Sequence, residues 1–399
     1  MARRGASERG NVPNQSESLP GIYTLKVIPS LGSLNWAGFL GRDRLPSPTM
    51  EMLDALYQKS LLITGAGGSI GSALALRVAP LAPPALLLLD TAESRLYALQ
   101  QLWKASGIAG SMTPILGNVA DRTLLDEIFT QHAPQIVLHA AAFKHVPLIE
   151  GQPLAAIANN IFGTLTLTRA AAAHGARMVL LSTDKAVQPA SVMGATKRVA
   201  ERIVLDAGGI VLRLGNVLAT RDSVAEAFAR QIALEKPLPV TDPAARRYFV
   251  TLDEAVNLLL IAAALPGTPA LLAPVLPAPH YVSDLAHFLI RELAPDQEIE
   301  IDFTAARPGD KTAEFLWSSG DAAQPILSGA SSQAPAIVSI QASQLPHAQL
   351  ASGLENLRAA LHARNLAATL LHLRSLVPDY TPSPSVLALA QQQGSRVSL

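Results

Sequence analysis

Short runs of apolar residues recur along the chain from Ser60 to Leu214, and longer segments of mixed polarity separate them. The runs that predict buried strands are Leu61–Ile63, Ala85–Leu89, Thr113–Leu116, Gln135–Leu138, Met178–Leu181 and Ile210–Leu212. The separating segments have the length and spacing of amphipathic helices. Continuous apolar strands that alternate with helices are typical of a parallel sheet covered on both faces. The sequence therefore predicts an α/β fold with a doubly wound, Rossmann-type sheet.

The order of elements changes after Asn216, where helices are separated by Pro-rich connections. This change predicts two domains: an NAD-binding Rossmann domain at 58–215 and a smaller α/β substrate-binding domain at 216–320. The remaining parts are expected to be a polar, disordered tail at 1–21, an arm at 22–57, and a carboxyl-terminal part at 321–399. In that last part we expect a Ser/Ala/Gln-rich, loop-like linker, two amphipathic helices between Leu345 and Leu376, and a frayed tail after Pro384.

Composition narrows the class of protein. Lys+Arg and Asp+Glu both number 31, so no net charge favours nucleic acid or a membrane surface as a partner. The chain has no cysteine, which excludes disulfides, cysteine-ligated zinc and thiol catalysis. No secretory signal is visible, and the most apolar region, 255–276, is interrupted by Asn257, Pro266 and Pro269. We expect a cytoplasmic enzyme without a membrane span.

A glycine-rich loop follows the first predicted strand. Gly65, Gly68 and Gly71 form Gly-x-x-Gly-x-x-Gly, with Ser69 and Ile70 between the last two. Such a loop lets a pyrophosphate approach the backbone at a helix amino terminus. Asp90 ends the second strand, where a carboxylate accepts a hydrogen bond from the ribose 2′-hydroxyl and repels a 2′-phosphate. This context favours NAD over NADP as the cofactor.

Two further strand ends are expected to contact the cofactor. Asn118 and Val119 follow the third strand, where an amide side chain can contact the adenine. The small residues Ala140, Ala141 and Ala142 follow the fourth strand and leave room for the cofactor. We expect no metal site, because nothing near His139 and His145 completes a ligand set.

The reaction centre is predicted at the end of the fifth strand, in Ser182-Thr183-Asp184-Lys185. Met193 and Lys197 follow at a spacing of four, so both lie on one side of a helix. In short-chain dehydrogenases this spacing is Tyr-x-x-x-Lys, in which the Lys contacts the nicotinamide ribose and lowers the pKa of the Tyr. Lys197, Ser182 and Thr183 match that pattern, but Met193 replaces the Tyr, and a thioether cannot take a proton.

Several motifs together resemble those of the capsular-polysaccharide-type nucleotide-sugar 4,6-dehydratases, extended short-chain dehydrogenases that act on UDP-N-acetylglucosamine. The motifs are Thr64–Gly71, Ala140–Pro147, Ser182–Ala186, Val192–Glu201, Arg213–Leu218, Arg247–Phe249 and Arg307–Lys311. The resemblance covers roughly residues 36–380. A subgroup of the family carries Met at the position of Met193. The chain is similar to the soluble catalytic part of relatives that carry amino-terminal membrane helices.

The resemblance implies a reaction in three steps: NAD takes hydride from C4 of the sugar, water is eliminated across C5 and C6, and the hydride returns to C6. By carry-over from the family, Asp184 is the acid for C6 and Lys185 the base for C5. These roles call for a raised pKa of Asp184 and a depressed pKa of Lys185. The base for the C4 hydroxyl stays open between Asp184 and a water held by Thr183 and Lys197.

The resemblance also implies substrate contacts. Lys144 and Asn160 are expected beside the sugar and pyrophosphate, Asn216 at the domain junction, Arg247 and Arg307 on the pyrophosphate, and Glu314 on the uridine ribose. Two positions depart from the family: Asn118, which is usually Asp, and Ala219-Thr220, which are usually smaller. The first of these positions corresponds to the adenine contact and the second to the fit near the sugar. A homo-oligomer is expected because relatives form closed ones.

Two alternative functions use the same fold. A nucleotide-sugar 4-epimerase needs neither a C5 base nor a C6 acid, so Asp184 and Lys185 argue against it. A catalytically silent NAD-binding protein is supported only by Met193.

Overall fold

The computed structural model describes residues 31–108, 110–267, 269–328 and 335–396. The predicted tail at 1–21 and the first part of the predicted arm lie outside these residues.

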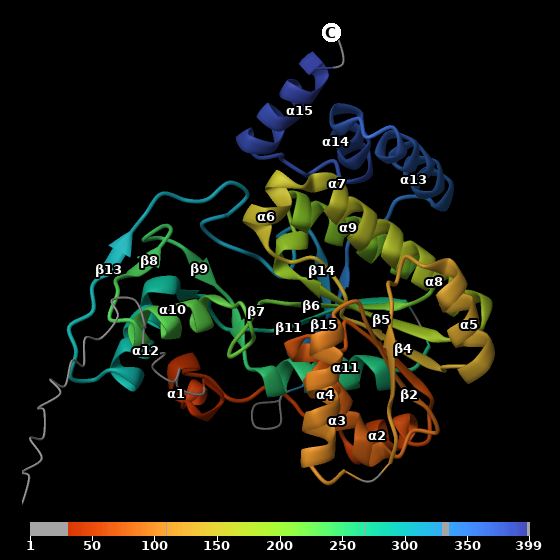
Figure 1. The fold of residues 1–399 in the computed structure, drawn as a ribbon, viewed down its shortest axis with the longest axis horizontal. Coiled ribbons are helices and arrows are strands. Elements are labelled where there is room, and N and C mark those ends of the chain that lie inside the picture. The colour runs from red at the N-terminus through yellow and green to blue at the C-terminus, as the bar shows by residue number, and fades with distance from the viewer. Residues whose placement is uncertain (1–30, 109, 268, 329–334, 397–399) are drawn as a thin grey trace, which may run out of the picture.

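A nine-stranded sheet forms the centre of the described part of the chain (Figure 1). Its strands, in spatial order, are β14 (Ala322–Ser328), β15 (Pro335–Gln341), β11 (Ala270–Pro274), β6 (Ile210–Leu214), β5 (Arg177–Thr183), β4 (Ile136–His139), β1 (Leu61–Thr64), β2 (Leu86–Asp90) and β3 (Thr113–Leu116). The strands from β11 to β3 are parallel, whereas β15 and β14 are antiparallel to their neighbours. The strand order reverses between β1 and β4, and ligands bind at such reversals in α/β proteins.

Helices cover both faces of this sheet, as the apolar strands predict. One layer contains α2 (Met50–Leu56), α3 (Ser69–Val78) and α11 (Leu252–Ala264), and α11 contacts the other two. The other contains α5 (Arg122–His132), α8 (Thr164–Ala173) and α9 (Val192–Asp206). The remaining helices of this region are α4 (Glu93–Ala105), α6 (Val146–Gly151), α7 (Pro153–Ala156) and the short η2 (Ala79–Leu81) and η4 (Asp184–Ala186), with a π-helical segment, η3 (Ile157–Gly163), between α7 and α8. The predicted fold class is confirmed.

A smaller lobe lies beyond the carboxyl ends of the parallel strands (Figure 1). Its helices are η1 (Leu31–Ser33), α1 (Trp36–Leu40), α10 (Val224–Ala233) and α12 (Val282–Leu293), and its short strands are β7 (Asn216–Val217), β8 (Leu238–Val240), β9 (Arg246–Arg247), β10 (Phe249–Val250), β12 (His280–Tyr281) and β13 (Ile301–Phe303). The described part of the predicted arm contributes Trp36 and Leu40 to this lobe's apolar core. Because α11 and β11 return to the main sheet, the lobe is not one continuous segment from 216 to 320.

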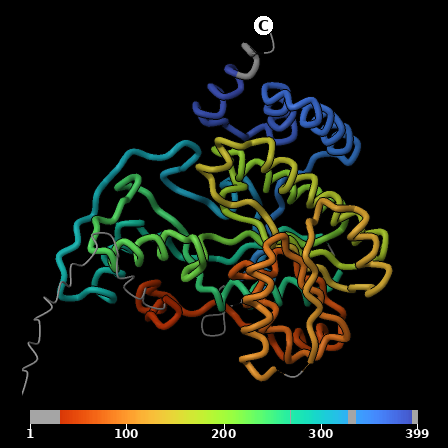
Figure 2. The backbone as a smooth tube through the Cα atoms, in the orientation of Figure 1, coloured from red at the N-terminus to blue at the C-terminus, as the bar shows by residue number. Residues whose placement is uncertain are grey.

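Three helices at the carboxyl end form a further layer over α6, α7 and α9 (Figure 2). They are α13 (His347–His362), α14 (Leu366–Leu376) and α15 (Pro384–Arg396). The prediction of a frayed tail after Pro384 is wrong. Val386 is fully buried in the apolar cluster that α13 and α14 form with α9, and the Ser383 hydroxyl accepts a hydrogen bond from the Val386 amide.

The linker predicted as a loop is also different in the structure, because β14 and β15 add to the main sheet there. Ile337, Val338 and Ile340 of β15 are buried, and β15 pairs with the otherwise open edge of β11. The small polar residues of this segment hide its β pattern in the sequence, because pairing to an existing sheet edge provides most of its order.

Candidate active site

One cavity of about 1230 Å³ lies at the carboxyl ends of β1, β2, β4 and β5 and extends under the smaller lobe. Most sequence-predicted site residues line it. They are Gly65, Gly68, Ser69, Ile70, Gly71, Asp90, Val119, Ala140, Ala141, Ala142, Lys144, Thr183, Lys185, Met193, Asn216, Arg247 and Arg307. Residues from separate strand ends therefore meet in one place, as a parallel sheet requires.

The glycine loop turns directly from β1 into α3. Gly65 has a φ of 68°, and a Cβ there would lie 2.7 Å from the Ala141 amide nitrogen. A Cβ on Gly71 would lie 2.2 Å from the Gly65 carbonyl oxygen, so the turn itself needs both glycines. Gly68 is less confined, since its Cβ would meet only the Gly65 carbonyl oxygen at 3.1 Å, and it leaves the amino end of α3 open to the cavity. This arrangement fits a dinucleotide pyrophosphate.

Asp90 joins the glycine loop to the end of β2. Its two carboxylate oxygens accept hydrogen bonds of 2.9 Å from the amides of Gly67 and Ala92, and the side chain lines the cavity. Asn118 differs from the prediction, because it is not among the lining residues and its side-chain oxygen accepts a hydrogen bond of 2.8 Å from the Ala120 amide.

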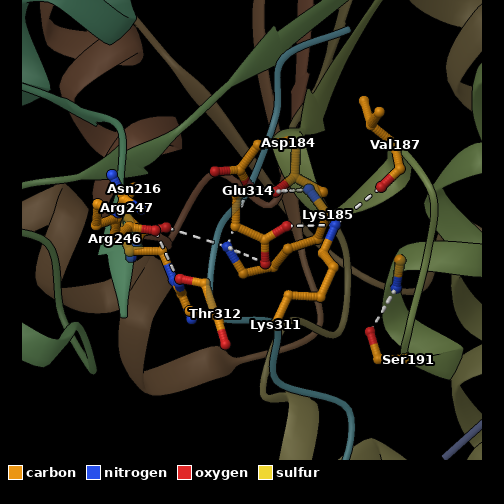
Figure 3. Close-up of polar contacts among 12 residues, drawn as sticks. Asp184, Lys185, Val187, Ser191, Asn216, Arg246, Arg247, Lys311, Thr312 and Glu314 are labelled. Carbon is orange, nitrogen blue, oxygen red and sulfur yellow. Dashed lines mark hydrogen bonds and ion pairs between the residues drawn. The ribbon is translucent and has the colours of Figure 1, made fainter. Parts of the chain in front are cut away.

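The residues after β5 form a chain of polar contacts. Thr183 lines the cavity, and its hydroxyl donates a hydrogen bond of 2.9 Å to Asp184 Oδ1. Asp184 is fully buried, and its Oδ2 has no hydrogen-bond partner among the residues that the structure describes. Lys185 Nζ lies 3.0 Å from Asp184 Oδ1 and 3.1 Å from Asn216 Oδ1. Figure 3 shows the Lys185 side chain between these partners and Glu314.

Glu314 is placed differently from its predicted role at the uridine ribose. It is not among the residues that line the cavity and is only 3% exposed. Its carboxylate lies between two lysines, with Oε1 at 3.8 Å from Lys185 Nζ and Oε2 at 2.5 Å from Lys311 Nζ (Figure 3). The Lys311 ammonium also donates to the Val187 carbonyl oxygen at 2.8 Å. Glu314 therefore belongs to the ion cluster around Lys185.

This cluster controls the charge of Lys185. Burial acts to lower the pKa of Lys185, but the charges of Asp184 and Glu314 outweigh burial and raise that pKa. The depressed Lys185 pKa expected from the sequence is therefore not found. Burial and the neighbouring Asp184 charge raise the pKa of Glu314, against the two lysines. The resting protein thus holds Lys185 as an ammonium ion.

Lys197 lies behind the reaction centre. Its Nζ donates a hydrogen bond of 2.7 Å to the Leu181 carbonyl oxygen, and it is not among the lining residues. Burial lowers the pKa of Lys197 to about 8, against the charge of Glu201. Met193, one turn earlier in α9, lines the cavity with its apolar side chain. No titratable group therefore occupies the position of the short-chain-dehydrogenase tyrosine.

A buried ion pair that the sequence analysis missed supports this strand end. Glu201 of α9 binds Arg213 of β6 through two hydrogen bonds of 2.7 and 2.8 Å and accepts a third, of 2.7 Å, from the Ser182 hydroxyl. The single Ser182 hydroxyl proton is therefore donated to Glu201, so toward a substrate hydroxyl Ser182 can only accept a hydrogen bond. The available sequence signal is that Glu201 and Arg213 lie at the ends of two of the family motifs. Their pairing cannot be predicted without the fold, which brings the two motifs together.

The remaining predicted substrate contacts divide into two groups. Asn160 is not among the residues that line the cavity, because its amide bonds both backbone groups of Phe143 and the Thr196 hydroxyl. Lys144, Arg247 and Arg307 do line it. Lys144 Nζ donates to the Arg221 carbonyl oxygen at 2.8 Å, and the Arg247 guanidinium donates to the Thr312 carbonyl oxygen at 3.1 Å.

His139 has a structural role here. Its ring nitrogens lie 2.7 Å from the Thr64 hydroxyl and 2.9 Å from the Thr164 hydroxyl. Burial lowers its pKa to about 3, so the ring is neutral at pH 7. Among the described residues, no group of three or more His, Asp or Glu side chains is arranged to hold a metal ion. None of the helices in the described ranges has the length and apolar character needed to cross a membrane.

Comparison with known proteins identifies the family of this chain. The sequence model of the family described as polysaccharide biosynthesis protein matches residues 61–334. The chain belongs to this family. It is 37% identical over 315 residues to the capsular polysaccharide biosynthesis protein CapD of Staphylococcus aureus, which covers 76% of this chain and 52% of the relative. The family member described here thus spans about half the length of that curated relative and of the probable polysaccharide biosynthesis protein EpsC of Bacillus subtilis.

Relatives closer in length have names that include a reaction. The chain is 30% identical over 276 residues to a UDP-N-acetylglucosamine 4,6-dehydratase (inverting) of Campylobacter jejuni, covering 66% of this chain and 79% of the relative. Among solved structures, Pen from Bacillus thuringiensis is similar with a TM-score of 0.64 and 26% identity over 72% of this chain and 89% of that one. The dTDP-glucose 4,6-dehydratase DesIV from Streptomyces venezuelae shares the fold, with a TM-score of 0.56 and 20% identity over 65% of this chain and 87% of that one.

Proposed function

We propose that the chain catalyses the NAD-dependent 4,6-dehydration of UDP-N-acetylglucosamine for polysaccharide or glycan biosynthesis. The observation that carries this proposal is the Thr183-Asp184-Lys185 chain of contacts, which meets the cavity beyond the glycine loop while Met193 replaces the tyrosine of a simple reductase. A reductase needs one proton relay, whereas elimination needs an acid and a base side by side. The Campylobacter jejuni relative with this named reaction supports the same choice.

The cofactor part of the proposal rests on the glycine loop, Asp90 and the small residues Ala140–Ala142. Bound NAD would supply a reversible hydride acceptor, which takes hydride from C4 and returns it to C6. Asp90 lies where it can accept from a ribose 2′-hydroxyl, and the open amino end of α3 faces the pyrophosphate. The DesIV structure, which contains NAD, has the same fold.

Thr183 and Asp184 form the acid–base relay in this proposal. Thr183 lines the cavity, and its hydroxyl donates to the buried Asp184 carboxylate at 2.9 Å. When the C4 hydroxyl is oxidised, its proton passes through Thr183 to Asp184. The same proton then leaves through Thr183 to the C6 hydroxyl, which departs as water. One carboxylate thereby acts as the C4 base and the C6 acid.

Lys185 serves as the C5 base after it loses its proton to Glu314. For this transfer, the gap of 3.8 Å between Lys185 Nζ and Glu314 Oε1 must close to hydrogen-bond length. The neutral amine then takes the C5 proton during elimination and returns a proton to C5 when hydride reaches C6. Asp184 begins and ends ionised, and the Lys185–Glu314 pair begins and ends with one proton, so the protons balance over one cycle.

The direct test mixes the purified protein with UDP-N-acetylglucosamine and NAD in heavy water. We expect a 4-keto-6-deoxy product, deuterium at C5 and no net NADH. Asp184→Asn should lower the rate at least ~100-fold because the relay loses its proton carrier. The exposed surface variant Asp126→Asn serves as the matched control. Failure to form a keto-deoxy product from UDP-, GDP- and dTDP-sugars would reject the proposal.

A 4-epimerase is the second candidate, because a UDP-glucose 4-epimerase of Rickettsia canadensis is 34% identical over 218 residues, 62% of that relative. An epimerase inverts C4 without breaking the bond from C5 to hydrogen. Product with the C6 hydroxyl retained and no deuterium at C5 would identify that reaction. The expected homo-oligomer and cytoplasmic location stay predictions.

A further inference from the structure

A short loop of the smaller lobe lies against the glycine loop of the main domain. Residues 219–223, here called the strap, connect β7 to α10. The Arg221 guanidinium donates a hydrogen bond of 2.6 Å from Nη2 to the Gly67 carbonyl oxygen, and the Arg221 amide donates one of 2.9 Å to the Ser69 hydroxyl. The strap thus holds a cation directly over the turn where the pyrophosphate of a dinucleotide would bind.

Other parts of the cavity wall also hold the strap. Lys144 Nζ, from the loop after β4, donates to the Arg221 carbonyl oxygen at 2.8 Å. The Asp222 carboxylate lies 4.0 Å from Arg95 of α4 and 3.9 Å from His145. Arg221, Asp222 and these three partners all line the cavity. The strap is therefore tied to α4 and to the loop after β4 as well as to the glycine loop.

The backbone of the strap is held in a shape that it would not choose by itself. Ala219 and Asp222 both have a φ of 57°, a conformation that residues with a side chain adopt rarely. Contacts must hold such a turn in place, and the contacts of Arg221 with Gly67 and Ser69 lie between the two strained residues. Loss of these contacts would let the strap move away from the glycine loop.

The charged side chains around the strap complement a pyrophosphate. Arg95, Lys144 and Arg221 supply three cations along the cavity wall, and Asp90 and Asp222 supply two carboxylates. Asp90 lies at the end of β2, where the ribose is expected, and Asp222 faces Arg95 and His145. Arg221 is the cation bonded to the glycine loop itself. A guanidinium fork also pairs with two phosphate oxygens at once, which an ammonium cannot do.

We propose that Arg221 is a dinucleotide-binding residue supplied by the smaller lobe, and that the strap must open before the dinucleotide can leave. The inference rests on the proposed function, because it takes NAD as the ligand of the glycine loop. In a reaction that returns the hydride within each cycle, the cofactor has no need to leave between turnovers. A closed strap is compatible with such a reaction, whereas a reductase that exchanges its cofactor each cycle would be slowed by it.

The test measures cofactor exchange directly, without substrate. Full-length protein is loaded with NAD, freed of excess by gel filtration and mixed with an excess of the fluorescent analogue etheno-NAD, and the exchange rate is followed by fluorescence. Arg221→Ala should exchange about tenfold faster or more than the wild type, since a charge-assisted contact is lost. Arg221→Lys should be intermediate because it keeps the charge but not the fork. The control is Arg122→Ala, whose side chain is 86% exposed on α5.

The outcomes separate the two proposals. Faster exchange in Arg221→Ala, with Arg122→Ala unchanged, supports the inference. If the wild type retains NAD and Arg221→Ala exchanges it at the wild-type rate, the proposed role of the strap is rejected while the proposed function is unaffected. A wild-type protein that binds neither NAD nor etheno-NAD would overturn both. Equal thermal unfolding temperatures of Arg221→Ala, Arg221→Lys and the wild type ensure that the comparison is between folded proteins.

Discussion

Among single residues, Glu314 allows the most specific prediction. Its carboxylate is one of two that raise the pKa of Lys185, so Glu314→Gln should lower that pKa. The Gln side chain cannot take the Lys185 proton, so in the variant neutral Lys185, the proposed C5 base, forms only as the pH rises and Lys185 loses its proton to solvent. The rising limb of the pH–rate profile should therefore move to lower pH in the variant. The measurement is deuterium incorporation at C5 as a function of pH.

A merely structural role of Glu314 predicts something else. If the variant were only less stable, its rate would be lower by the same factor at every pH, and the rising limb of the pH–rate profile would stay at the wild-type pH. A falling limb that moves to lower pH would instead mean that Lys185 acts as an acid. Glu355→Gln, an exposed substitution on α13, provides the control with the same chemical change.

Single residues also show where sequence reasoning stops. The motifs located Thr183, Asp184 and Lys185 because a strand end and residue type are enough to identify a reaction centre. They could not give the direction of a side chain, so Asn160 was assigned to the substrate although its amide bonds Phe143 and Thr196. Glu314 was misplaced for the same reason. Arg221 belongs to no motif, and its position depends on how two lobes meet.

At the scale of elements, one buried charge network joins α9, β5 and β6 behind the reaction centre. Burial acts to raise the pKa of Glu201, but Arg213 outweighs burial and lowers it to about 2, against an ordinary value of 4.5. A folded-state pKa below the unfolded value stabilises the protein above the unfolded pKa. This part of the stability should be lost as the pH falls from about 4.5 to about 2. Urea unfolding at a series of pH values measures it.

The variant Glu201→Gln isolates this contribution. It should be less stable than the wild type at pH 7 by about 3–5 kcal/mol, because Arg213 is left buried without its partner. Its stability should also fall less steeply than that of the wild type over the same acid range. Equal acid slopes in the two proteins would mean that Glu201 is not the group that titrates.

Elements differ in how well the sequence predicts them. The parallel strands are predictable from the sequence because they are buried on both faces and are therefore continuously apolar. β14 and β15 are not, since an antiparallel pair at the edge of a sheet tolerates small polar residues and is ordered by its neighbour. The helix α15 was missed because its apolar residues are few, and its order comes from Val386 packing into a cluster already formed by other helices.

At the scale of the whole molecule, the site is assembled by three apolar cores. One surrounds the main sheet, one fills the smaller lobe, and one joins α13–α15 to α6 and α9. The third core contributes Met193 to the cavity, although no residue of α13–α15 lines it. The carboxyl-terminal helices should therefore affect catalysis only by holding α9 in place.

Two leucines of α14 test this view within one helix. Leu373 is fully buried in the cluster that contains Met193, whereas Leu371 is 65% exposed. Leu373→Ala should lower the free energy of unfolding by about 2–5 kcal/mol through lost contacts and a cavity. It should also reduce the rate of dehydration, because α14 packs against α9. Leu371→Ala should change neither quantity. A Leu373→Ala protein that is destabilised by this amount but keeps the full wild-type rate would show that α9 is positioned without the third core.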